Sequence, residues 1–175
     1  MNRNATALAL ATSALTGLGV VSPASGITMR AAEPASSTER GVVMECTGSR
    51  HGLDAYASLY ENDLYGNTVQ VVLDDDPARS ASRRPQDVLA GGVVRAGVMI
   101  AGHRVRIRGS AHRVGRRLPV HEVTDDAGQH IVVDGIHRRL ATDLVLRYAG
   151  TRVPLSCAPA FFYRLEVTRT GITGS

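Results

Sequence analysis

The chain has 175 residues, and 20 basic residues against 16 acidic ones give it a formal charge of +4 at pH 7. Every basic residue is an arginine, because the sequence contains no lysine. Apolar residues make up 43% of the chain and aromatic residues 4%. This composition can bury a core, and it excludes a disordered tail, a coiled coil, a collagen-like fibre and a polytopic membrane protein.

The first residues have the pattern of a secretory signal peptide. Arg3 is the only charge before an uncharged stretch over residues 5–21, and small residues follow that stretch. Cleavage after Ala24 is favoured over cleavage after Gly26. An uncleaved membrane anchor is disfavoured, because the stretch is short and diluted by Gly, Ser and Thr. We therefore expect a cleaved signal peptide over residues 1–24, secretion to the extracellular space and no stable membrane anchor.

The next segment, residues 25–41, is small and polar and has the composition of a flexible linker. From residue 42 onward, apolar and polar residues mostly alternate, which is typical of strands with one buried face. The alternating runs cover residues 42–46, 53–60, 69–73, 88–95, 98–108, 118–124, 129–133, 136–140, 143–148, 152–157 and 161–168.

Turn-forming sequences separate these runs, at residues 66–67, 125–128, 134–135 and 149–150. The pattern predicts an all-β fold over residues 42–170: one antiparallel β-sandwich or β-barrel of about eight to ten short strands, followed by a tail over 171–175. Residues 56–65 also fit one face of a helix, but a strand followed by a loop agrees better with the neighbouring runs.

Cys46 and Cys157 both lie in the mature chain. In an oxidising compartment such a pair is expected to form a disulfide. A catalytic thiol and a metal site are the alternatives, but no further metal ligands adjoin either cysteine. Each cysteine shares the parity of apolar neighbours, Val42 and Met44 for the first and Val153 and Leu155 for the second. The bridge is therefore expected to point inward and to join an early strand to a late one through the core.

Charge is distributed unevenly. Residues 42–76 hold seven acids and one arginine, whereas residues 79–117 hold ten arginines and one acid. In the second block, strict alternation places Arg104, Arg106 and Arg108 in a row on the outer face of a strand. Such a row suits an anionic cell-wall polymer or a sulfated glycan, unless the acidic segment folds against it. A purely solvated face is the alternative, and nucleic acid is disfavoured because aromatic residues are missing from the block.

Other residues are weaker candidates. Tyr56, Tyr60 and Tyr65 are candidates for binding a partner protein, since exposed tyrosines are frequent in binding surfaces; packing under a loop would explain them equally. Asp74, Asp75 and Asp76 are weak calcium candidates, with an exposed turn as the alternative. Four histidines lie nine residues apart, but nothing in their spacing shows that they converge on zinc or copper: His103, His112, His121 and His130.

The sequence contains no nucleophile elbow and no phosphate-binding glycine loop. We expect a disulfide-stabilised, extracellular binding protein without a cofactor, whose partner is a protein or an anionic cell-wall polymer. A small secreted hydrolase, whose carboxylates would come together only in the fold, is the first alternative. A structural envelope protein is the second, and the sequence does not determine the oligomeric state.

Overall fold

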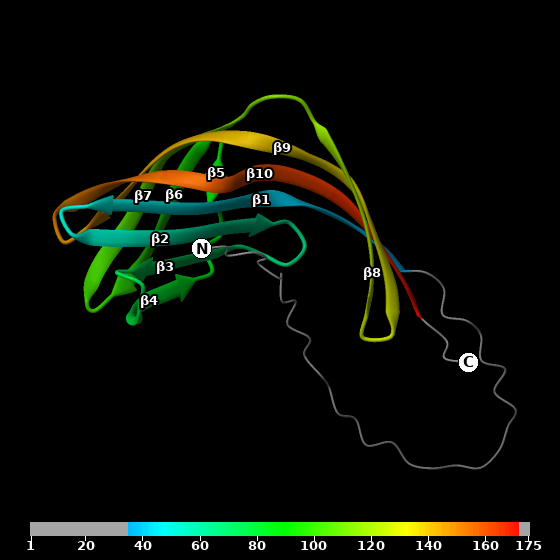
Figure 1. The fold of residues 1–175 in the computed structure, drawn as a ribbon, viewed down its shortest axis with the longest axis horizontal. Helices are drawn as coiled ribbons and strands as arrows, with labels where there is room; N and C mark the ends of the chain where they lie inside the picture. Colours follow the sequence, from blue (N-terminus) through cyan, green and yellow to red (C-terminus); the bar gives the residue numbers. More distant parts are fainter. Residues whose placement is uncertain (1–34, 172–175) are drawn as a thin grey trace, which may run out of the picture. The chain divides into compact units, whose positions relative to one another are not determined.

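The computed structural model describes residues 35–171, which form an antiparallel sheet of ten strands (Figure 1). The expected signal peptide lies outside the described residues. The described part contains no helix long and apolar enough to cross a membrane. The strands are β1 (Ala35–Arg50), β2 (Leu53–Asn62), β3 (Thr68–Leu73), β4 (Asp76–Arg83), β5 (Leu89–Ala90), β6 (Val93–Ile100), β7 (His103–Arg113), β8 (Leu118–Asp126), β9 (Gln129–Tyr148) and β10 (Thr151–Gly171).

The predicted all-β, antiparallel class is confirmed. The strand order is β4-β3-β2-β1-β10-β9-β7-β6-β5, with β8 paired to β9 off this path. The sheet curls until β3 and β4 approach β6, to which they are not hydrogen-bonded (Figure 1). The result is a half-barrel, in which one sheet folds around its own core.

The core lies on the concave face of the curled sheet. It is built from alternate residues of almost every strand, as the period of two predicts. Fully buried examples from five strands are Met44, Leu59, Val71, Ile107 and Leu146. The segment over residues 56–62 is part of strand β2, so the helical alternative is excluded.

Strand lengths differ from those expected. Strand β9 has 20 residues and β10 has 21. Three of the expected short strands are joined in β9, and two are joined in β10. The expected turn at residues 134–135 lies within β9. A Cβ atom on Gly135 would come within 2.2 Å of the backbone oxygen of Arg164 on β10. This glycine therefore permits a close approach of two strands rather than a turn.

The segment expected to be a linker also differs in part. Strand β1 begins at Ala35, so residues 35–41 form the first part of the strand and pair with residues 163–169 of β10. Together with β8 and the adjoining half of β9, these segments continue the sheet past the half-barrel (Figure 1). We refer to residues 35–40, 118–126, 129–137 and 164–171 as the sheet extension.

The predicted disulfide between Cys46 and Cys157 is confirmed. Cys46 is fully buried and Cys157 packs against the core. The two residues are direct partners in the register of β1 and β10. The bridge therefore joins neighbouring strands, and the expectation that it crosses the core is wrong, because the first and last strands lie side by side.

Loss of the bridge is expected to destabilise the domain. The cysteines are 111 residues apart, so the bridge restricts most of the unfolded chain. We predict that the double variant Cys46→Ala/Cys157→Ala loses about 2–4 kcal/mol of unfolding free energy, measured by urea titration. Reduced wild-type protein is the control, because it keeps both side-chain volumes. Equal stability of the oxidised, reduced and variant proteins would contradict this role.

Candidate functional site

The three arginines predicted to share an outer face do so. Val105 and Ile107 are fully buried, whereas Arg104, Arg106 and Arg108 are exposed on the other face of β7. Since the side chains of a strand alternate between its two faces, burial of the two apolar residues fixes the position of the three arginines.

The neighbouring strands enlarge this row. Arg108 lies opposite Arg95 on β6, and Arg106 lies opposite Arg147 on β9. Arg147 in turn lies opposite Arg152 on β10. We call these six exposed residues the arginine band: Arg95, Arg104, Arg106, Arg108, Arg147 and Arg152. The sequence indicated only the members on β7, because the others become neighbours through strand pairing.

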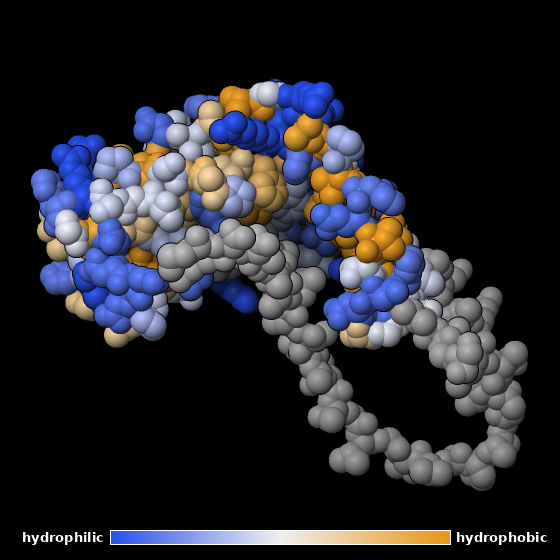
Figure 2. All heavy atoms as spheres, in the orientation of Figure 1, coloured by the Kyte–Doolittle hydropathy of each residue, from blue (hydrophilic) through white to orange (hydrophobic). Residues whose placement is uncertain are grey.

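The band extends in two directions. Alternate residues on one strand stand about 7 Å apart, and paired residues on adjacent strands about 5 Å apart. In Figure 2, hydrophilic residues are frequent at the left end of the domain, with apolar residues between them; Figure 1 shows the turn between β9 and β10 at this end. Arg147 and Arg152 flank this turn. The guanidinium groups therefore form a patch, wider than the single row that the sequence predicted.

The acidic segment does not neutralise the band through ion pairs. Within residues 35–171, none of its six arginines forms a salt bridge. Two acids of the segment pair elsewhere, Asp63 with Arg40 and Asp74 with Arg79. The band therefore presents charge that no described carboxylate contacts.

An open cavity of about 1260 Å³ is lined by the C-terminal ends of β2 and β7, by the middle of β1, β9 and β10, and by residues of the segment 86–92. Its lining includes the Arg113 guanidinium, which stacks 3.6 Å from the centre of the Phe162 ring. The cavity also contains Glu61, Asp63 and Asp87. It is the place where the carboxylates of a hydrolase would be sought.

Two of these carboxylates serve the fold. Glu61 Oε2 accepts hydrogen bonds from the backbone N–H groups of Val88 and Leu89, at 3.0 and 2.9 Å. Asp63 accepts from both the backbone N–H and the side-chain Nε–H of Arg40, each at 2.9 Å. These contacts fix the segment before β6 and the turn after β2. An acid–base pair would instead need carboxylates directed at a substrate.

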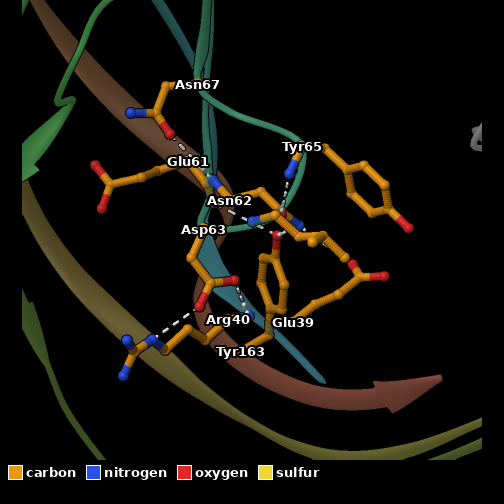
Figure 3. Close-up of polar contacts among 9 residues, drawn as sticks. Glu39, Arg40, Glu61, Asn62, Asp63, Tyr65, Asn67 and Tyr163 are labelled. Atoms are coloured by element: carbon orange, nitrogen blue, oxygen red, sulfur yellow. Dashed lines mark hydrogen bonds and ion pairs between the residues drawn. The ribbon is translucent and has the colours of Figure 1, made fainter. Parts of the chain in front are cut away.

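A buried polar cluster adjoins the cavity (Figure 3). Asn62 is 2% exposed, and its Oδ1 accepts from the backbone N–H groups of Leu64 and Tyr65, each at 2.8 Å. Its Nδ2 donates to the Tyr163 hydroxyl at 2.8 Å and to Glu39 Oε2 at 3.2 Å. The cluster joins β1, β2, β10 and the turn after β2. Sequence reasoning missed it, because its members come from distant parts of the chain.

The chemistry of Tyr163 is consistent with a structural role. Burial, and secondly the hydrogen bond to Tyr60, raise the pKa of its hydroxyl far above the usual value. The hydroxyl therefore remains protonated and donates to the Tyr60 hydroxyl at 3.3 Å.

The three tyrosines predicted as partner contacts have different surroundings. Tyr56 and Tyr60 are half-buried on the outer face of β2, and Tyr60 joins the polar cluster through Tyr163. Tyr65 lies in the turn after β2, where both Tyr65 and Leu64 are 52% exposed. Only this turn presents a strongly exposed tyrosine among the three.

The calcium candidates form part of the β3–β4 turn. Asp74 accepts from the backbone N–H of Asp54 and pairs with Arg79, and Asp76 accepts from the backbone N–H of Ala78. Within residues 35–171, no group of three or more His, Cys, Asp or Glu residues is arranged to hold a metal ion.

The four regularly spaced histidines have separate surroundings. His103 packs edge-on against Tyr148, with ring centres 5.8 Å apart, and His112 lies beside Gly92. His121 contacts Asp134 and His130 contacts Asp125, each with a nitrogen–oxygen distance of 2.7 Å. The last two histidines therefore belong to the hairpin of β8 and β9.

Comparison with known proteins found no matching family model, no matching curated protein and no matching solved structure.

The polar cluster gives a prediction about stability. Asn62→Ala removes four side-chain hydrogen bonds and leaves buried groups without partners, so we expect a loss of about 2–4 kcal/mol of unfolding free energy. Tyr163→Phe keeps the ring and removes only the hydroxyl, so we expect a loss of about 1 kcal/mol. Chemical unfolding measures both. If both variants lost the same unfolding free energy, or if Asn62→Ala lost none, Asn62 would not be the residue that holds the polar cluster together.

Proposed function

We propose that the protein is an extracellular, non-catalytic protein that binds an anionic polymer through the arginine band. The observation that carries this proposal is the band itself: six exposed arginines on four neighbouring strands, without a salt-bridge partner among the described residues. Secretion would follow from cleavage of the expected signal peptide after Ala24. The disulfide is compatible with an oxidising extracellular environment.

The geometry favours a polymer that carries phosphate or sulfate groups. Each guanidinium offers a planar fork of donors, which matches the oxygens of such groups. Because the band extends both along and across the strands, it can contact adjacent groups of a folded chain or of parallel chains. Cell-wall teichoic acid and sulfated glycans have this chemistry.

A partner protein is the second candidate. The exposed Leu64 and Tyr65 form an apolar and aromatic tip on the turn after β2. Surfaces of this kind contribute strongly to protein binding. The turn is held by Asn62, so it would meet a partner in a fixed conformation.

Binding to immobilised heparin or teichoic acid tests the proposal. Arg104→Ser/Arg106→Ser/Arg108→Ser is expected to bind weakly and to lower the slope of log affinity against log salt by roughly one for each arginine removed. A second triple variant, Arg95→Ser/Arg147→Ser/Arg152→Ser, is expected to lose a similar part of the binding affinity, because its residues belong to the same band.

The control is Arg83→Ser/Arg84→Ser/Arg116→Ser, which removes the same charge from exposed positions outside the band. We expect it to retain most of the affinity. If all three triple variants weakened binding equally, net charge rather than the band would be responsible. Binding of wild type no stronger than that of the first variant would contradict the proposal.

A further inference from the structure

Strand β8 presents a free edge. Within residues 35–171 it pairs only with β9, and its other side meets no strand (Figure 1). An unpaired edge offers a row of N–H and C=O groups to another strand, so proteins usually shorten, cover or charge such edges. Strand β8 has nine residues and one proline, Pro119, near its start.

The register shows which backbone groups point outward. Ala127 and Gly128 form a two-residue turn with φ of 50° and 76°, and Asp126 and Gln129 close it. In such a hairpin the closing pair exchanges hydrogen bonds, and bonded and non-bonded pairs then alternate. His121, Val123 and Asp125 therefore direct their N–H and C=O groups away from β9, to the free edge.

The side chains of the same three residues form an ordered ladder with β9. His121 contacts Asp134 and Asp125 contacts His130, each at 2.7 Å. Between these two His–Asp contacts Val123 lies opposite Val132, and Val123 is 53% exposed. Along the edge, the order is thus a basic group, an apolar group and an acidic group.

We propose that β8 pairs antiparallel with β8 of a second copy of this chain, in the register centred on Val123. Val123 then faces the partner's Val123, and His121 faces the partner's Asp125. Each outward N–H and C=O of His121, Val123 and Asp125 finds a backbone partner. On one face of the joined sheet carboxylate and imidazole groups alternate in the order Asp134, His121, the partner's Asp125, the partner's His130.

Charge selects this register over its neighbours. A register centred on Glu122 places that carboxylate opposite its own copy. A register centred on Thr124 places Glu122 opposite the partner's Asp126. Like charges directly opposite each other destabilise a strand pair, whereas opposite charges stabilise it. In the register centred on Val123, Glu122 faces the partner's Thr124, and each His121 faces an acid.

The dimer does not depend on polymer binding. The arginine band lies on β6, β7, β9 and β10 of the half-barrel, whereas the proposed contact uses only β8 of the sheet extension. Loss of one is not expected to abolish the other.

The mature, disulfide-bonded protein allows a direct test by sedimentation over a range of concentrations. Wild type is expected to dimerise. Val123→Pro removes an outward N–H that makes no bond to β9, so the fold should persist while the dimer dissociation constant rises roughly tenfold or more. Val123→Thr is the control, because it keeps the N–H and a β-branched side chain, and it should still dimerise.

Cross-linking tests the register. Residues that exchange hydrogen bonds across an antiparallel pair stand about 5.5 Å apart, within the range of a disulfide. Val123→Cys is therefore expected to form a covalent dimer on mild oxidation, and Glu122→Cys is not. A monomeric wild type, a dimer insensitive to Val123→Pro, or cross-linking at residue 122 in preference to 123 would overturn the proposal.

Discussion

The antiparallel pairing of β1 with β10 determines the rest of the structure. Residues 35–47 of the first strand lie against residues 156–169 of the last, and the disulfide between Cys46 and Cys157 covalently links this pair. Strands β2, β3 and β4 follow on the β1 side of this pair, and strands β9, β7, β6 and β5 follow on the β10 side. The sheet is therefore continuous only because β1 and β10 meet. Contacts between strands so distant in the chain close a large loop, which is entropically costly and slows folding. A covalent link there reduces this cost in the oxidised protein.

The arginine band depends on a second feature of the topology. Strand β8 pairs with the first half of β9, which leaves the second half of β9 to pair with β7. Arg106 and Arg147 become neighbours through this pairing, and β10 adds Arg152. The same division of β9 creates the sheet extension and its free edge. One long strand therefore supports both the candidate binding face and the proposed contact between copies.

Local features were predictable from the sequence. Alternation identified the buried faces of β2, β3 and β7, and parity placed both cysteines on core-facing positions. The arginine row on β7 followed from the same alternation, because the parity of a strand is fixed by its own residues. The sequence also indicates turns at residues 125–128 and 149–150; the structure has turns at 127–128 and 149–150.

Features that depend on strand partners were not predictable. The sequence predicts a turn at Gly135, since a glycine needed for close packing has the same local appearance as one needed for a turn. Arg147 and Arg152 joined the band only through the register. Asn62 and Tyr163 are 101 residues apart and meet at 2.8 Å, and no local pattern links them.

The proposed function requires that the arginine band contacts the polymer. Nuclear magnetic resonance can follow the Nε–H groups of the arginines while a sulfated oligosaccharide is added. We expect the resonances of the six band arginines to shift together, whereas those of the cavity residues Arg113 and Arg138 remain in place. Shifts confined to the cavity, or spread evenly over all arginines, would contradict the proposed function.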